Sequence, residues 1–441
     1  MTVTVAEVRM WGSRVGAVRW DPDRAVAAYE YDPSFLASQI ELAPLSMPLG
    51  PGVWSFPQLS RTTFKGLPGM LADSLPDKFG TALIDAWLVR NGRSVDDFSP
   101  VERLCYVGNR GMGALEFAPA IDTGDSSNSP LEIAQLVDLA QKAITPKRTL
   151  VIDVDPGGEQ PDADDLTEII RVGTSAGGAR AKAVIAWNET TGEIRSGQLD
   201  QPTGFTHWLL KFDGVDGNRD KELADPLGYG HVEHAYAQMA KAAGIDVPRT
   251  RLLEEQGRAH FMTERFDRVD GDRLHLQSLT ALGHFDFNMA GAYSYEQSID
   301  VMRKLRLSNA DLVEQFRRAV FNVVGRNQDD HTKNISFLMD RRGQWRLSPA
   351  YDITYAYNPE GAWTSAHQMT LNGKRDDFER NDIARFATAV DLTEVEGLRL
   401  LDQILDVVAN WATFARDAGV APQMIAEVER NLRTSSPLTS A

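Results

Sequence analysis

The chain has 441 residues, which is long enough for two or three domains. Its hydrophobic content of 42% and charged content of 24% are typical of a soluble globular protein. Lys and Arg number 46 against 62 Asp and Glu, a net charge of −16, which argues against a large nucleic-acid surface on this chain itself. The single cysteine, Cys105, excludes an intramolecular disulfide and a zinc cluster of cysteines.

No uncharged apolar run reaches membrane-spanning length, and the first residues lack a signal-peptide pattern. We therefore expect a cytoplasmic protein with no membrane partner. Short β-like runs at residues 15–20 and 26–31 open the chain, and an amphipathic helix is expected over residues 81–90. The glycine-rich run 107–117 ends at a proline without a following helix, so we interpret it as a structural turn.

Residues 121–130 have the composition of a linker, and a helix is expected over residues 131–143. A loop of small residues then spans 173–182 and precedes a β run. Small residues let backbone N–H groups approach phosphate oxygens, but this loop matches neither Walker A nor the kinase glycine pattern. Phosphate binding and a plain hairpin turn both remain open for it.

Parts of a nucleotide site follow in order. Lys211 lies in the strand-like run 207–212, where a kinase lysine would grip phosphates, although a solvent-facing lysine is an alternative. Glu233 opens the predicted helix 232–243, placed to pair with Lys211 or simply to complement the helix dipole. The strand 260–268 lies where a kinase hinge reads adenine.

An acidic loop over residues 327–334 lies between an apolar helix that ends at Gly325 and a predicted hairpin over residues 335–347. Protein kinases place an Asp that accepts the hydroxyl proton five positions before an Asn that binds Mg²⁺, and a second Asp beyond the hairpin. Asp329, Asn334 and Asp352 fit this order and Asp330 does not. We predict Asp329 as the base and Asn334 and Asp352 as Mg²⁺ ligands; the alternative is an acidic loop that only caps turns.

These motifs together resemble the HipA-type toxin serine/threonine kinases of bacterial toxin–antitoxin pairs, over nearly the whole chain. The segments that carry the resemblance are residues 64–77, 111–115, 175–182, 264–268, 329–334 and 351–352.

The resemblance implies an α+β fold: a kinase-like two-lobed core with an added β-rich N-terminal subdomain and a helical C-terminal lobe. The expected divisions are an N-terminal subdomain over 1–120, a linker and helix over 121–150, the rest of the N-terminal lobe over 151–270 and a helical catalytic lobe over 271–441. The cofactors would be ATP and Mg²⁺. The residues expected to contact the nucleotide are Ala176, Gly177, Gly178, Ala179, Lys182, Lys211, Glu264, Phe266, Gln277, His331 and Asn334.

In the family, a serine at the position of Ser175 is autophosphorylated, which shuts the kinase off. The implied partner is a small helix-turn-helix antitoxin of the HipB type, which would supply the contacts to operator DNA. The implied substrate is a protein of translation, such as an aminoacyl-tRNA synthetase. Two alternatives stay open: a catalytically weak co-repressor that binds the antitoxin on DNA, and a metal-dependent hydrolase using His331, Asp329, Asp330 and Asp352.

Overall fold

The computed structural model describes most of the chain. The described residues are 3–121, 130–144, 172–173, 180–199, 201–215, 219–220, 223–224, 227–269, 271–435 and 437–439. Three buried hydrophobic clusters form the core of these residues, and each is built on a different set of helices and strands.

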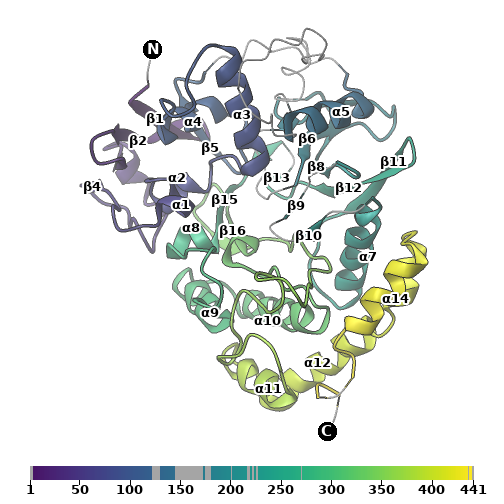
Figure 1. Ribbon diagram of the computed structural model, residues 1–441. Helices are drawn as coiled ribbons and strands as arrows, with labels where there is room; N and C mark the ends of the chain where they lie inside the picture. The colour runs from purple at the N-terminus through teal and green to yellow at the C-terminus, as the bar shows by residue number, and fades with distance from the viewer. Residues whose placement is uncertain are drawn as a thin grey trace.

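The first unit is an antiparallel sheet near the N-terminus, the N-terminal sheet, with strand order β4-β3-β2-β1-β5 (Figure 1). Alternation explains its faces: Ala6, Val8 and Met10 of β1 are buried while the residues between them are more exposed. The helix α4 (Pro100–Val107) begins with a capping box between Ser99 and Glu102. The remaining elements here are β1 (Val5–Met10), β2 (Ser13–Asp21), β3 (Val26–Tyr31), β4 (Val53–Trp54), β5 (Leu115–Ala118), η1 (Phe35–Ser38), α1 (Arg61–Phe64) and α2 (Gly69–Ala72).

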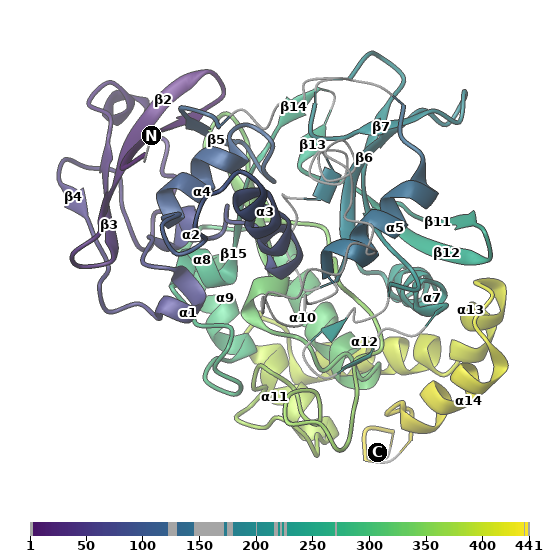
Figure 2. The ribbon, with the colours of Figure 1, turned by 45° about the horizontal axis from the view of Figure 1, so that its top comes forward.

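The second unit is an antiparallel sheet, the second sheet, with strand order β11-β12-β8-β6-β7. The helices α3 (Lys78–Arg90) and α5 (Ile133–Ile144) share a buried cluster with this sheet. Figure 2 shows α5 beside β6. Its strands are β6 (Lys182–Trp187), β7 (Ile194–Ser196), β8 (Thr206–Lys211), β11 (Thr250–Glu255) and β12 (Arg258–Glu264); two short ladders pair β9 (Arg219–Asp220) with β10 (Leu223–Ala224) and β13 (Arg268–Val269) with β14 (Asp272–Arg273).

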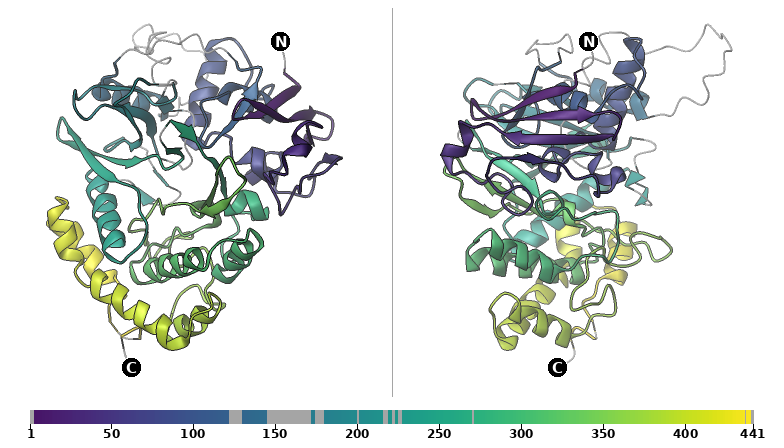
Figure 3. Two further views of the ribbon diagram at one scale, coloured as in Figure 1. Left: turned by 180° about the vertical axis from the view of Figure 1, so that it is seen from behind. Right: turned by 90° about the vertical axis from the view of Figure 1, so that its left-hand side faces the viewer.

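The third unit, the helical lobe, lies on the opposite side of the molecule from the N-terminus (Figure 3). It contains a small sheet of order β15-β16-β17, and α7 (Tyr229–Ala242) packs its apolar face into the same core. The elements are α8 (Leu279–Gly283), α9 (Tyr295–Lys304), α10 (Asn309–Val324), η2 (Thr332–Asn334), α11 (Arg380–Thr388), α12 (Glu394–Val408), α13 (Trp411–Asp417), α14 (Pro422–Asn431), β15 (His275–Ser278), β16 (Ser336–Met339) and β17 (Trp345–Leu347).

The predicted α+β class is confirmed: a two-lobed core carries a β-rich subdomain at its N-terminus and a helical lobe at its C-terminus. The exact domain boundaries stay a prediction. The helix α3, which we expected within the N-terminal subdomain, shares its core with the second sheet instead, because Leu83 and Leu88 pack into that cluster. Among the described helices, none combines the length and apolar character needed to cross a bilayer.

Candidate active site

The acidic loop connects α10 to β16, as its sequence predicts. Gly325 is the C-cap of α10, and Asn334 ends the short helix η2 just before β16. The Asn334 side-chain amide donates a hydrogen bond to the backbone carbonyl of Asp329 at 3.0 Å. One oxygen of the Asp329 carboxylate accepts a hydrogen bond from the indole Nε1 of Trp363 at 2.6 Å. The five-residue spacing therefore brings Asp329 and Asn334 to one side of the loop.

Asp330 is turned into the protein, away from Asp329's surroundings. It accepts hydrogen bonds from the Tyr295 hydroxyl and the Gln368 backbone N–H, each at 2.7 Å. His367 Nδ1 lies 2.7 Å from the same carboxylate. Burial opposes ionisation, but His367 and these hydrogen bonds outweigh it and hold the pKa of Asp330 below its ordinary value. Asp330 therefore braces the loop, which leaves Asp329 as the candidate base.

Lys211, Glu233 and Asp352 come together from three separate elements. Lys211 ends β8, and its Nζ forms ion pairs with Glu233 of α7 and, at 2.6 Å, with Asp352. Burial alone would lower the pKa of Lys211, but the two carboxylates outweigh it and raise that pKa above its ordinary value. Burial likewise opposes the charge on Asp352, yet Lys211 and Lys182 lower the pKa of Asp352 to about 2. Lys211 and Asp352 are therefore both charged at neutral pH.

Asp352 occupies a backbone conformation that is uncommon for an aspartate. Its φ is +52°, in the left-handed region. Strain of this kind, of order 1–3 kcal/mol, concentrates at functional sites. It turns the carboxylate toward the end of β8, where it meets Lys211.

Lys182 begins β6 and lies directly opposite Lys211 in the second sheet. Its Nζ is 3.2 Å from Asp77 Oδ2, and both side chains are only 3% exposed. Asp77 is the N-cap of α3, so its position comes from the segment that precedes the second sheet by a hundred residues. Lys182 is therefore held beside the Lys211 cluster by an acid that we did not predict.

His331 and Phe266 lie at the edges of this cluster. His331 Nε2 is 3.9 Å from Asp329 Oδ1, and its ring packs against Phe287 at 5.3 Å between centroids. The Phe266 ring lies 5.8 Å from that of Tyr351, the residue before Asp352. Both therefore lie beside segments that carry the candidate base and the candidate metal ligand.

Two predicted nucleotide contacts point elsewhere. Glu264 pairs with Arg249 at 2.8 Å on the face of the second sheet. Gln277 is fully buried, and its amide donates to the backbone carbonyl of Leu42 in the N-terminal unit. Because both side chains already have protein partners, we leave them out of the site proposed below. The backbone of residues 264–266 remains where a hinge is expected.

The predicted phosphate loop, with Ser175, Ala176, Gly177, Gly178 and Ala179, lies outside the described residues. Just after it, the Nη1 atom of Arg180 lies 3.3 Å from Oε2 of Glu233. The guanidinium carbon of Arg180 lies over the ring of Tyr229, 4.5 Å from the ring centroid. The sequence analysis also missed Asp77 and Trp363. A signal existed only for Asp77, which lies in the motif 64–77 that carries the family resemblance.

The oxygen donors suit magnesium. Asn334 and Asp352 line one polar pocket with Asn327 and Tyr351. Magnesium in nucleotide sites is held by one or two protein oxygens, with phosphate and water completing the octahedron. Among the described residues, no three His, Cys, Asp or Glu side chains gather as a metal site, which is the set that the hydrolase alternative requires.

Two family models match the chain: the HipA N-terminal domain over residues 6–118 and the HipA-like C-terminal domain over residues 174–421. The Sinorhizobium fredii protein named "Putative kinase Y4dM" is 27% identical over 202 residues, 41% of this chain and 48% of that protein. "Putative kinase Y4mE" of the same organism is 26% identical over 211 residues, 45% of this chain and 43% of that protein. The chain thus spans less than half the length of these relatives.

A solved structure shares the fold over almost its whole length. It is a chain from the Shewanella oneidensis MR-1 toxin–antitoxin complex of HipA, HipB and operator DNA, with a TM-score of 0.66 and 17% sequence identity. The alignment covers 97% of this chain and 96% of that one. At this identity the likeness concerns the fold alone.

Proposed function

This chain belongs to the HipA family, and from that premise we propose that it is an ATP- and Mg²⁺-dependent serine/threonine protein kinase. The observation that carries the proposal is the double ion pair of Lys211 with Glu233 and Asp352. It links the second sheet to α7 and to the segment after the small sheet. Kinases need the same links between the phosphate-binding lysine, its helix glutamate and a metal-binding aspartate. The kinase names of the Sinorhizobium relatives agree with it.

Each residue has a defined part in this proposal. Lys211 and Lys182 bind phosphate oxygens, and Glu233 keeps Lys211 in place. Asn334 and Asp352 hold the magnesium ion. Asp329 accepts the proton of the substrate hydroxyl, and Asn334 fixes the Asp329 backbone. The nucleotide with its metal supplies the phosphoryl group.

We further propose that the kinase is the toxin of a toxin–antitoxin pair. The structurally similar chain is described in complex with HipB and operator DNA. A net charge of −16 suits a chain whose partner makes the DNA contacts. The substrate would be a protein of translation, such as an aminoacyl-tRNA synthetase, and Ser175 would be the inhibitory autophosphorylation site, since a phosphate there adds a charge of about −1.5 to −2 near the nucleotide phosphates.

The test of the activity is phosphate transfer by wild type and by Asp329→Asn. Wild type, incubated with labelled ATP, Mg²⁺ and a cell lysate, should label a lysate protein and itself, and mass spectrometry should identify the target and Ser175. Asp329→Asn should lose transfer by at least about a hundredfold because the base is absent. Asp300→Asn removes an exposed carboxylate from α9 and should behave as wild type. Full transfer by Asp329→Asn would contradict the assignment.

A further inference from the structure

The segment 73–77, which connects α2 to α3, contacts both the second sheet and the helical lobe. Asp73 accepts hydrogen bonds from the backbone N–H of Ser278 at 2.6 Å and from its hydroxyl at 2.9 Å. Ser278 is the N-cap of α8, in the helical lobe. Asp77, four residues later, forms its ion pair with Lys182 of the second sheet. The short segment between α2 and α3 thus contacts both the second sheet and the helical lobe.

The Asp77–Lys182 pair is sealed from solvent. Asp77 Oδ1 accepts a hydrogen bond from the Gly80 N–H at 2.6 Å, which caps α3. The other oxygen, Asp77 Oδ2, lies 3.2 Å from the Lys182 ammonium. Burial raises the pKa of Asp77, and Lys182 is the largest influence that opposes this rise. A buried ammonium needs a countercharge, and for Lys182 that countercharge is Asp77.

The register of the second sheet gives this pair its significance. Lys182 and Lys211 are direct partners on neighbouring antiparallel strands, so their side chains lie on the same face of the sheet. Like charges in this arrangement repel, and here each lysine has its own carboxylate.

We propose that Asp77 is a positioning residue that holds Lys182 beside Lys211, so that two ammonium groups face the polyphosphate chain of the nucleotide. This inference rests on the proposed kinase function. Through Asp77, the segment that joins the N-terminal unit to α3 contributes to the affinity of the site for triphosphate. Asp77 touches Lys182 and not the nucleotide, so its effect passes through the lysine.

The decisive experiment compares a nucleotide that has phosphates with a nucleoside that has none. Asp77→Asn keeps an acceptor for the Gly80 N–H, since Asn is a good N-cap, but removes the charge that holds Lys182. Calorimetry on the full chain should give a Kd for Mg²⁺·ATP that rises roughly tenfold or more, since tenfold is the lower end of the coupling measured for close charge pairs. The Kd for adenosine should be unchanged, because adenosine does not reach Lys182.

A double-mutant cycle with Lys182→Met separates positioning from a merely structural role. If Asp77 acts through Lys182, then Asp77→Asn should add nothing to the loss of ATP affinity in Lys182→Met. The matched control is Asp85→Asn, which removes another ion-paired carboxylate from α3, the partner of Arg103 at 2.8 Å. That variant should bind ATP and adenosine as wild type does.

Three results would overturn the inference: an unchanged ATP affinity in Asp77→Asn, an equal loss of adenosine affinity, or additive effects in the cycle. Should Asp77→Asn fail to fold by circular dichroism, Lys182→Met alone still decides, because unchanged ATP affinity in that variant rules out the lysine. Failure of the proposed function looks different, since wild type itself would then bind no Mg²⁺·ATP.

Discussion

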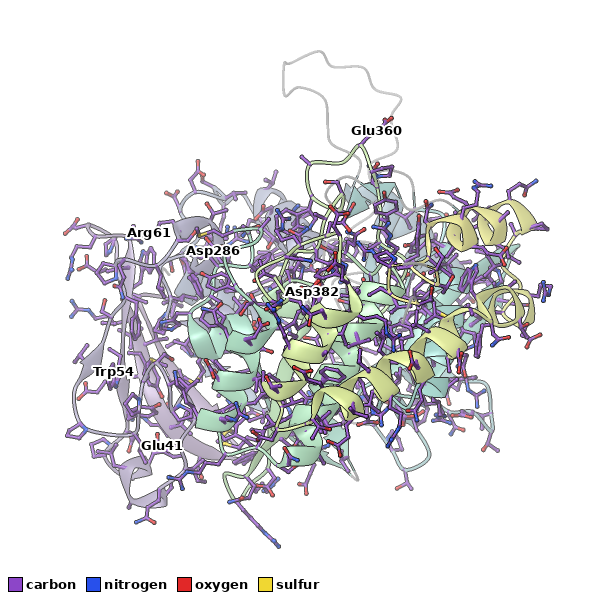
Figure 4. The ribbon with its side chains drawn as sticks, turned by 90° about the horizontal axis from the view of Figure 1, so that it is seen from below. Glu41, Trp54, Arg61, Asp286, Glu360 and Asp382 are labelled. Atoms are coloured by element: carbon purple, nitrogen blue, oxygen red, sulfur yellow. The ribbon has the colours of Figure 1, made fainter. Side chains whose placement is uncertain are left out.

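The indole of Trp363 contacts the candidate base, Asp329, and the sequence did not predict this contact. It donates its N–H to Asp329 at 2.6 Å and comes from the loop that follows Asp352. Glu360, in the same loop, projects from the body of the molecule (Figure 4). A hydrogen bond to a carboxylate fixes the direction of its oxygens, so we expect Trp363 to orient Asp329 if Asp329 is the base.

Trp363→Phe should therefore lower kcat while it leaves ATP affinity unchanged. The ring stays but the N–H is lost, and a hydrogen bond to a charged group is worth about 1.5–3 kcal/mol, or roughly tenfold or more in rate. Steady-state kinetics together with ATP calorimetry measure both quantities. Trp345→Phe is the matched control, since it removes an indole hydrogen bond to Glu41 outside the site. A higher kcat in Trp363→Phe would mean that the indole blocks the base and would refute its orienting role.

Local sequence patterns predicted where the acidic loop 327–334 lies but not the residues that contact it. Asp329 was preferred over Asp330 because of the five-residue distance to Asn334, and the hydrogen bond between Asn334 and Asp329 agrees with that spacing. Trp363 lies 34 positions after Asp329, and Asp77 lies 105 positions before Lys182, the residues that they contact. Nothing in a short window of sequence encodes such contacts, because they depend on how separate elements pack.

At the scale of elements, the glycine-rich turn after α4 has a definite task. We interpreted it as structural, and its backbone forms hydrogen bonds with Asp267 and Arg268, which follow strand β12. The Gly113 N–H donates to Asp267 at 2.7 Å, and Arg268 donates to the carbonyls of Gly113 and Gly111. Gly113 has φ +74°, and a Cβ there would lie 3.1 Å from the backbone of Leu276. This close approach requires glycine.

Asp267→Asn should loosen this connection and destabilise the protein by about 3–5 kcal/mol, the cost of breaking a buried ion pair from one side. Asp267 is fully buried and pairs with Arg265 and Arg268 at 2.7 and 2.8 Å. Urea unfolding at pH 7 measures the change. Asp272→Asn, which breaks an exposed pair with Arg341, is the control and should unfold with the wild-type midpoint.

The same variant tests the pH dependence. Burial alone would raise the pKa of Asp267, but Arg265 and Arg268 outweigh it and hold that pKa well below its ordinary value. A carboxyl whose pKa is lower in the folded state than in the unfolded state stabilises the fold at pH values above the ordinary carboxyl pKa of about 3.9. This stabilisation is lost progressively as the pH falls below that value. Asp267→Asn should therefore lose stability less steeply than wild type as the pH is lowered from about 5 to 3. Equal slopes would contradict this account.

Regular elements were the most predictable part of the fold, since α10, β8 and β16 follow from periodicity and glycine stops. How those elements pack against one another was less predictable from the sequence. The helix α3 was expected with the N-terminal subdomain because it is contiguous with it in sequence, yet its apolar face covers the second sheet. An amphipathic pattern shows that a helix has a buried face but does not say which neighbour buries it.

At the scale of the whole molecule, the site joins the second sheet, the helical lobe and the segment 73–77 that connects α2 to α3, so nucleotide binding should stabilise the entire fold. A ligand present at a hundred times its Kd adds about 2.7 kcal/mol to the free energy of unfolding. Thermal unfolding with and without Mg²⁺·ATP measures this effect. Wild type and Asp329→Asn should gain equally, because the role proposed for Asp329 involves the substrate hydroxyl and not the nucleotide. In Asp352→Asn, most of the Mg²⁺-dependent increase in stability should disappear. With ATP in EDTA, where no Mg²⁺ is available, Asp352→Asn and wild type should be stabilised about equally. A full Mg²⁺-dependent gain in Asp352→Asn would show that the metal is held elsewhere.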